Sequence, residues 1–187
     1  MLEGASDEEL MALVAAGDQA AFRMLMTRHM RRAIRIAQGI VGVAAEADDI
    51  GQETFLRVWR AAQTFDGRRA RFTTWMHQIV VNLAIDRTRR PRTEPIEAAG
   101  EVADPAPGAL TGLIDAEETT AVRRALAAMP ERQRAAISLF HFEGLSGRDS
   151  AQAMQLSDKA FESLLNRARS ALRQTVETML GDRGRRP

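Results

Sequence analysis

Apolar residues recur at intervals of three and four along most of this chain, the spacing of one face of an α-helix. The pattern is most regular between positions 48 and 90, where two such stretches follow one another and hold both tryptophans. Each stretch has a single apolar face, which predicts two helices that bury those faces in a core. Their apolar positions are Ile50, Phe55, Leu56, Val58 and Trp59 in the first, and Phe72, Trp75, Met76, Ile79, Val80 and Leu83 in the second.

A short basic segment, residues 66–71, separates these two predicted helices. It contains Gly67 and three arginines, and no large apolar residue that calls for burial. We therefore expect the helical pair to present this segment as a charged surface loop.

Local signals place two more helices before position 45. Ser6 and the carboxylate three residues later have the spacing of a capping box, which starts a helix. Gly17 followed by Asp18 is typical of a helix end and the N-cap of the next helix. Gly39 and Gly42 are expected to interrupt that second helix.

The helical pattern returns in the last third of the chain. Pro130 stands at a favoured first-turn position, and Gly144 is expected to end the helix that follows. Ser146 and Ser157 occupy N-cap positions before two further helices. Two helices joined by a short turn form a helix-turn-helix, whose second helix can lie in the major groove of DNA. Gln155 stands in that turn, where glycine is usual.

The composition changes between the two helical parts. Residues 91–118 contain four of the six prolines, mixed with alanine, glycine and acids, which is typical of a linker. Fully extended, this segment would span roughly 90 Å and so could join modules held well apart. The sequence thus predicts an all-α protein of two small helical domains, residues 1–90 and 119–187, joined by a flexible acidic linker.

Net charge is segregated along the 187 residues, although the whole chain carries only +1. Residues 1–90 carry +2, residues 91–118 carry −6 and residues 119–187 carry +5. All basic residues but Lys159 are arginines, whose planar guanidinium suits phosphate and guanine edges, although a GC-rich genome would produce the same bias.

The composition also bears on compartment and chemistry. Without cysteine there is neither a disulfide framework nor a thiolate metal site, and no apolar run is long enough to span a membrane. The acidic N-terminus is unlike a signal peptide, so we expect a cytoplasmic protein. An enzyme would need ligand spacing among its three histidines, a phosphate-binding loop or a paired nucleophile and base. None is present, so no catalytic residue, metal or cofactor is expected.

One ordered set of residues runs through both predicted domains. It comprises Gly17, Asp18, Ala21, Phe22, Asp48, Asp49, Ile50, Gln52, Glu53, Phe55, Trp59, Phe72, Trp75, Ile79, Asn82, Asp86, Met129, Pro130, Arg134, Glu143, Gly144, Leu145, Ser146, Arg167, Ala168, Arg169, Leu172 and Arg173. With this set the chain resembles the extracytoplasmic-function group of bacterial sigma-70 family sigma factors, which keep only regions 2 and 4. The resemblance implies a polymerase subunit that supplies promoter recognition and helps to open the duplex.

Within that resemblance, Asp49, Gln52, Glu53 and Trp59 match the surface that docks on the clamp helices of a large catalytic subunit of core RNA polymerase. The acids could instead be a solvated helix start, and Trp59 could be a core residue, as could Phe65, Phe72 and Trp75. The resemblance also implies promoter DNA and an anti-sigma factor as partners.

The basic loop and the helix after it match the segment that reads the minus-10 promoter element. Melting flips a non-template base out of the stack, so a pocket must compensate for the lost stacking. The resemblance assigns this role to the loop with Asn82, whose amide both donates and accepts hydrogen bonds. The arginines after the helix match phosphate contacts. The minus-10 candidates are Phe65, Arg68, Arg69, Arg71, Phe72, Asn82, Arg87, Arg89 and Arg90.

The recognition helix of the second domain is expected to begin at about Asp158 and to read the minus-35 element with the face opposite its apolar stripe. Many relatives have a basic residue where this chain has Glu162, and a glutamate can accept a hydrogen bond from the cytosine amine. The minus-35 candidates are Ser157, Lys159, Glu162, Ser163, Asn166 and Arg167.

A stand-alone helix-turn-helix regulator is the alternative function. It would bind duplex DNA specifically by itself, with the N-terminal part serving as an interaction domain. A sigma factor with a flexible linker would bind weakly alone, because the polymerase sets the separation of its modules.

Overall fold

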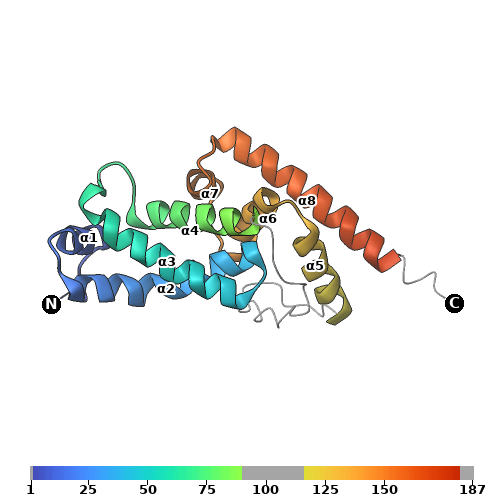
Figure 1. The fold of residues 1–187 in the computed structure, drawn as a ribbon. Coiled ribbons are helices and arrows are strands. Elements are labelled where there is room, and N and C mark those ends of the chain that lie inside the picture. The colour runs from blue at the N-terminus through green and yellow to red at the C-terminus, as the bar shows by residue number, and fades with distance from the viewer. Residues whose placement is uncertain (1, 90–115, 182–187) are drawn as a thin grey trace.

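The computed structural model describes residues 2–89 and 116–181, and within these ranges it contains helices and turns but no strand. The expected linker and Arg90 thus lie outside the described residues, except for the last few positions of the linker. The elements are α1 (Asp7–Ala15), α2 (Gln19–Val41), α3 (Ala44–Ala61), η1 (Ala62–Thr64), α4 (Phe72–Arg89), α5 (Ala116–Ala128), α6 (Glu131–Ile137), η2 (Ser138–Phe142), α7 (Gly147–Ala153) and α8 (Asp158–Gly181) (Figure 1). The expected all-α fold is confirmed.

The helix starts follow the local signals in the sequence. The Ser6 side chain accepts a hydrogen bond from the amide of Glu9, whose carboxylate accepts one from the Ser6 amide, which is the reciprocal capping box. Asp18 accepts from the amides of Ala20 and Ala21 and so caps α2. Ser146 caps α7 in the same way.

Gly39 does not interrupt α2, contrary to the prediction from sequence. The helix runs through it to Val41 and ends at Gly42, which has φ 77°. Gly39 is required for a different reason: a Cβ at this position would overlap the hydroxyl of Ser138 in η2. A close approach between two segments far apart in sequence, rather than a helix break, therefore explains this glycine.

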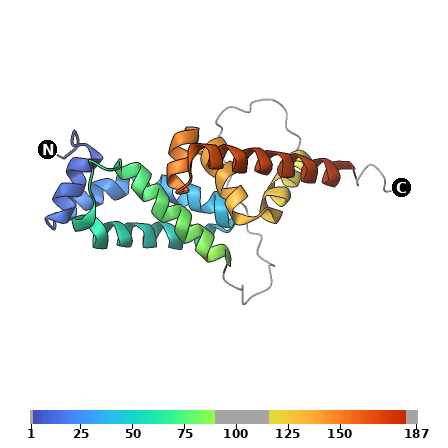
Figure 2. The same cartoon turned by 90° about the horizontal axis from the view of Figure 1, so that it is seen from above.

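The N-terminal part is built around α2, which lies against α1, α3 and α4 (Figures 1 and 2). At Gly51 the contact between α2 and α3 is close, since a Cβ there would lie 2.6 Å from Ile34 Cγ1. Burial of large apolar side chains is the main favourable term that holds these helices together. Fully buried side chains of this core include Leu25, Ile36, Ile40, Phe55, Val58, Phe72 and Met76.

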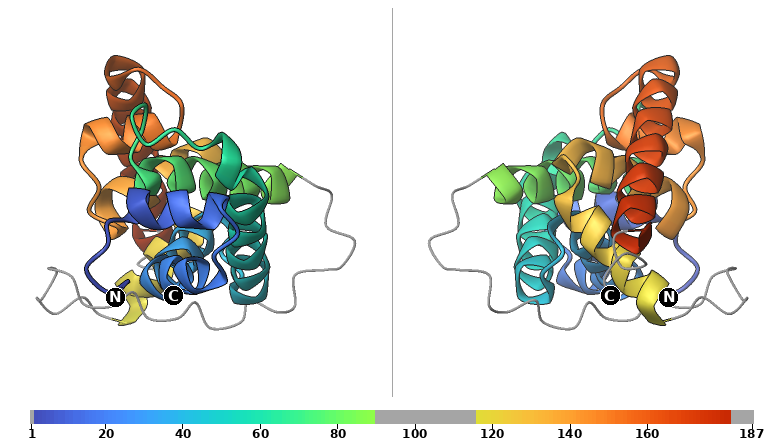
Figure 3. Two further views of the ribbon diagram at one scale, coloured as in Figure 1. Left: turned by 90° about the vertical axis from the view of Figure 1, so that its left-hand side faces the viewer. Right: turned by 90° about the vertical axis from the view of Figure 1, so that its right-hand side faces the viewer.

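Helix α8 lies against α5, α6 and α7 in the C-terminal part, and the right-hand view of Figure 3 shows α8 beside α5. The turn between α7 and α8 contains Gln155 in the left-handed region, with φ 55°. A glycine would adopt this conformation without strain, whereas a glutamine pays roughly 1 kcal/mol for it. The expected helix-turn-helix is thus present, with a strained residue in its turn.

The two helical parts pack against each other, a contact that no local pattern in the sequence predicts. Helix α4 contacts α6 and α7, and α2 contacts α6 and η2. Gln78 donates from Nε2 to the carbonyl of Gln152 at 3.0 Å, and Arg89 Nε lies 2.9 Å from Glu131 Oε1. Val81 and Ile85 lie between Gln78 and Arg89 on the same face of α4 and are buried. Helix α4 therefore has a second buried face besides the expected one.

We call the contact of α2 and α4 with α6, η2 and α7 the seam. An ion pair centred on Glu143 lies in this seam. Glu143, whose side chain is only 5% exposed, accepts from Arg35 Nε at 3.0 Å and from Arg35 Nη2 at 3.1 Å. Arg32 Nε lies 3.4 Å from the same carboxylate, and Arg32 Nη2 donates to the Glu143 carbonyl at 3.2 Å. The carboxylate raises the pKa of the Arg35 guanidinium. Charge-assisted pairs of this geometry hold the two parts in a defined register.

His77 of α4 is buried, and charged groups from both helical parts affect its pKa. Burial is the main cause that lowers its pKa to about 4, with the charges of Arg32 and His29 acting in the same direction and Asp149 opposing them. His77 is therefore neutral at pH 7.

Candidate nucleic-acid interface

Helix α3 turns one side toward the core and leaves the other exposed. Asp49 and Gln52 are exposed, while Glu53 is half-buried and accepts a hydrogen bond from Arg57 Nε at 3.0 Å. Trp59 is 37% exposed and its ring packs edge-on against Phe22, with centroids 5.0 Å apart. All four predicted polymerase-binding residues therefore lie on accessible positions of one helix.

Leu56 does not belong to the buried face of α3, contrary to the prediction from the apolar pattern. It is 48% exposed and lies one turn after Gln52 on the outer side of the helix. The buried positions Ala47, Ile50, Thr54 and Val58 recur at three and four and exclude position 56 from their stripe. That spacing was the signal that could have identified Leu56, together with Trp59, as an exposed apolar pair.

The basic loop has a defined conformation at its start. Asp66 Oδ1 accepts from the amide and from Nε of Arg68, both at 3.0 Å, and the Asp66 carbonyl accepts from the amide of Arg69. The hydrogen bonds with Arg68 lower the pKa of the Asp66 carboxyl. The side chain of Arg68 is 92% exposed, and Arg69 and Arg71 are exposed too. The loop therefore presents three guanidinium groups to solvent.

Phe72 is a core residue, the alternative to its expected contact with the minus-10 element. Its side chain is fully buried, with ring centroids 5.3 Å from His29 and 6.3 Å from both Phe65 and Trp75. A base cannot stack on it in this structure. Phe65 and Trp75 are only partly buried, and their rings lie 5.0 Å apart at the base of the loop. Phe72 thus packs against Phe65 and Trp75, the aromatic side chains on either side of the loop.

Asn82 is exposed on α4, and Arg87, five residues later, is half-buried. Arg87 Nη2 lies 4.0 Å from Asp49 Oδ2, so the candidate phosphate-binding and polymerase-binding groups adjoin each other. Arg89 is paired with Glu131 across the seam. A backbone hydrogen bond of Glu131 and, second to it, the hydrogen bond from Arg89 lower the pKa of the Glu131 carboxyl. Arg89, one of the predicted phosphate contacts, is therefore already paired with Glu131 when the two helical parts are in contact.

Helix α8 buries Phe161, Leu164, Leu165 and Ala168 and exposes its opposite face. The hydroxyl of Ser157 accepts from the amide of Ala160 at 3.2 Å and caps the helix. Arg167 Nε donates to the carbonyl of Ser163 at 3.3 Å, which directs this guanidinium along the helix. The six minus-35 candidates are all exposed, namely Ser157, Lys159, Glu162, Ser163, Asn166 and Arg167.

Among residues 2–89 and 116–181, no group of three or more His, Asp or Glu side chains could hold a metal ion. Within the same ranges, no helix is both long and apolar enough to cross a membrane.

These surfaces belong to two helical units of which the second is a helix-turn-helix, the architecture of a DNA-binding transcription protein. Residues 25–93 match the family model Sigma-70 region 2, and residues 119–172 match Sigma-70, region 4. The ECF RNA polymerase sigma factor SigM of Mycobacterium tuberculosis is 36% identical over 170 residues, covering 89% of this chain and 83% of that protein. The RNA polymerase sigma-H factor of Pseudomonas aeruginosa is 30% identical and covers 96% and 98%.

A solved structure of CnrH in complex with the cytosolic domain of CnrY matches with a TM-score of 0.68 and 28% identity, covering 93% of this chain and 99% of that one. The sigma factor RpoE in complex with the anti-sigma factor NepR from Bartonella quintana shares the fold, with a TM-score of 0.60 and 19% identity over 83% of this chain and 96% of that one.

The chain belongs to the extracytoplasmic-function group of the sigma-70 family. Sigma factors are subunits of RNA polymerase that direct initiation at specific promoters, and they are not enzymes. This membership decides against the stand-alone regulator.

Proposed function

We propose that this sigma factor docks on a large subunit of core RNA polymerase through the outer side of α3. The observation that carries the proposal is the exposed apolar pair Leu56 and Trp59, bordered by Asp49, Gln52 and Glu53. Large exposed apolar side chains flanked by polar groups are typical of the centre of a protein interface. The acids would complement a basic partner surface and guide its approach.

The basic loop and α4 would read the minus-10 element on the melted strand. Arg68, Arg69 and Arg71 supply positive charge for the phosphates, and Asn82 offers both a donor and an acceptor to a flipped base. Phe65 and Trp75, partly exposed beneath the loop, are available for stacking, whereas buried Phe72 is not.

The exposed face of α8 would enter the major groove at the minus-35 element. Lys159 and Arg167 suit guanine or phosphate, Asn166 suits adenine, and Glu162 accepts from cytosine. The functional units would be residues 1–90 and 119–187, with 91–118 between them.

We expect an anti-sigma factor to control the protein by covering the α3 surface, as the resemblance implies. CnrH was solved bound to the cytosolic domain of another protein, which is consistent with such control. The place of action would be the cytoplasm, where core polymerase transcribes the chromosome.

The test is to assemble the purified chain with core RNA polymerase and genomic DNA and to map RNA start sites. Discrete new starts that share a two-part upstream motif are expected. Asn82→Ala should weaken them, whereas Gln63→Ala, which removes an exposed amide from η1, should not. Duplex binding by the free protein without any new starts would refute the proposal.

A further inference from the structure

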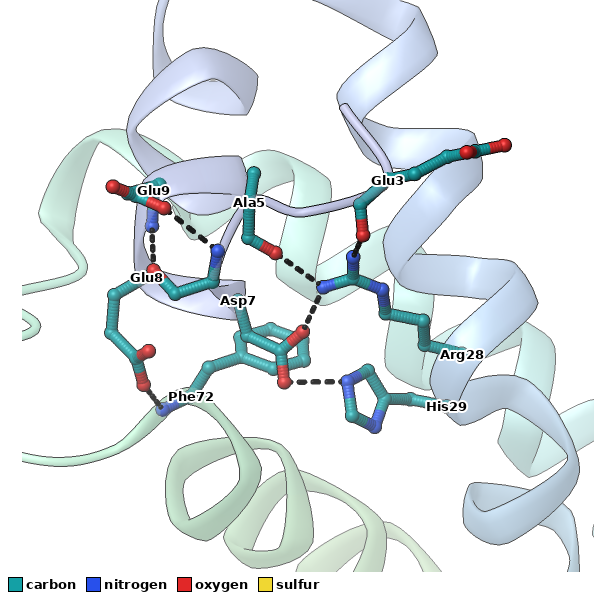
Figure 4. A network of polar contacts seen from close by, with 9 residues as sticks. Glu3, Ala5, Asp7, Glu8, Glu9, Arg28, His29 and Phe72 are labelled. Atoms are coloured by element: carbon teal, nitrogen blue, oxygen red, sulfur yellow. Dashed lines mark hydrogen bonds and ion pairs between the residues drawn. The ribbon is translucent and has the colours of Figure 1, made fainter. Parts of the chain in front are cut away.

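Helix α1 lies before the segment that matches Sigma-70 region 2, yet it contacts the start of α4 and the basic loop (Figure 4). We infer that Glu8 of α1 is a positioning residue for promoter reading: its carboxylate fixes the first turn of α4 and the loop that precedes it. The inference rests on the proposed function, since it assumes that this loop reads the minus-10 element.

The N-terminus of α4 has no side-chain cap of its own. The carbonyl of Arg71 accepts from the amide of Trp75, which makes Arg71 the N-cap residue, and arginine has no side-chain acceptor. Glu8 Oε1 instead accepts from the amide of Phe72 at 2.9 Å, across 64 residues of sequence. A carboxylate at this place satisfies a free amide and interacts favourably with the helix dipole.

Glu8 also contacts the other end of the loop. A Cβ at Gly67 would lie 3.2 Å from Glu8 Cγ and 3.4 Å from Glu8 Cβ, so the stem of the glutamate packs closely on the glycine backbone. One side chain thus touches both Gly67 and Phe72, the two ends of the segment with the three exposed arginines. The loop is held at both ends while its guanidinium groups remain accessible.

Helix α1 is itself anchored firmly enough to serve as a support. Asp7 Oδ1 pairs with Arg28 Nη1 at 3.0 Å, and Asp7 Oδ2 lies 2.7 Å from His29 Nε2. Arg28 also donates to the carbonyls of Ala5 and Glu3, at 2.7 and 3.0 Å (Figure 4). These bonds tie the start of α1 to α2, so the position of Glu8 is defined by the core of the N-terminal part.

The sequence offers a conservative variant and a matched control. Glu8→Gln keeps an Oε1 acceptor for the Phe72 amide, whereas Glu8→Ala removes it. Glu9→Ala removes a neighbouring carboxylate whose hydrogen bonds are confined to Ser6 at the start of α1. All three substitutions change the net charge equally, so differences among them report the contacts of the Glu8 side chain with Phe72 and Gly67 rather than the charge.

The experiment uses polymerase reconstituted with the full chain and a promoter recovered by start-site mapping. Initiation is compared on that promoter and on versions with single minus-10 substitutions. Glu8→Ala should lower the discrimination between them about fivefold, the equivalent of about 1 kcal/mol for a lost cap, with unchanged affinity for core polymerase. Glu8→Gln should remain within about twofold of wild type, and Glu9→Ala should match wild type.

Hydrogen exchange on the full chain gives a second readout that does not depend on DNA. Peptides that cover residues 66–75 should exchange faster in Glu8→Ala than in Glu9→Ala. The inference is overturned if exchange of these peptides is unchanged in Glu8→Ala, or if promoter discrimination falls equally in Glu8→Gln and Glu8→Ala. Unchanged discrimination in Glu8→Ala, while Asn82→Ala lowers it, would also overturn it and leave the proposed function standing. If Asn82→Ala and Arg69→Ala leave discrimination unchanged too, the proposed role of the loop is wrong and the inference falls with it.

Discussion

Removal of the Glu143 carboxylate should open the seam. In Glu143→Ala both hydrogen bonds from Arg35 and the contact with Arg32 Nε are lost, while the bond from Arg32 to the Glu143 carbonyl can remain. A buried hydrogen bond to a charged group contributes about 1.5 to 3 kcal/mol, and a fully exposed ion pair at most about 1 kcal/mol. The acid is buried, but the side chains of Arg35 and Arg32 are 48% and 34% exposed and regain hydration when the pair breaks.

An intermediate loss of about 2 kcal/mol in docking free energy is therefore expected, which lowers the ratio of docked to open molecules about 30-fold. The chain has no cysteine, so spin labels can be attached selectively at Ala45→Cys in α3 and Ser170→Cys in α8, both exposed positions. Double electron–electron resonance should give one narrow distance population for the parent and an additional broad population at longer distance for Glu143→Ala.

The matched control is Glu53→Ala, which breaks a pair of the same length, Arg57 Nε to Glu53 Oε1 at 3.0 Å, inside α3 alone. Its distance distribution should equal that of the parent. If Glu143→Ala also leaves the distribution unchanged while circular dichroism shows intact helices, the ion pair does not hold the two parts together.

Three further predictions follow from the seam and the helix-turn-helix. The pKa of His77 is about 4 in the folded chain and about 6.5 in the unfolded chain, so the unfolded state binds more protons at any pH between these two values. The free energy of unfolding should therefore fall as pH drops from about 6.5 to about 4. At pH 5 the loss relative to pH 7 should be about 2 kcal/mol larger for the parent than for His77→Gln in urea unfolding, and equal losses would contradict the assignment. Gly39→Ala should lower the unfolding free energy by about 1 to 3 kcal/mol because its Cβ overlaps the Ser138 hydroxyl, and Gly39→Ala with Ser138→Gly should recover most of it; no recovery would place the strain elsewhere. Gln155→Gly should raise the melting temperature slightly, by relief of the left-handed glutamine, and a decrease would show that the glutamine side chain contributes more than its strain costs.

Features with local causes could be predicted from the sequence, and those with long-range causes could not. The caps at Ser6, Asp18 and Ser146 depend on side chains within three residues of the amides they satisfy, so their spacing identifies them. A glycine within a helical pattern is typical of a helix break, and the pattern predicts one at Gly39. The structure gives another reason for it: only a glycine leaves room for the side chain of Ser138, about one hundred residues later.

The candidate site divides in the same way. The exposed arginines of the loop and the exposed face of α8 follow from periodicity and charge. The burial of Phe72 and the second buried face of α4 depend on neighbours from α1, α6 and α7, which no local pattern reveals. Family resemblance supplied the roles of these surfaces, and the packing shows which of their side chains are accessible.

In the three ion pairs described across the seam, the N-terminal part supplies the cations and the C-terminal part supplies the acids: Arg32 and Arg35 pair with Glu143, and Arg89 pairs with Glu131. Arg89 is also a candidate ligand for a DNA phosphate. Glu131 and a phosphate then compete for one guanidinium, so each phosphate bound there removes a restraint on the separation of the two parts. Nucleic acid would then compete with Glu131 for Arg89, and the fraction of molecules in which the two parts are in contact should fall as the concentration of polyanion rises.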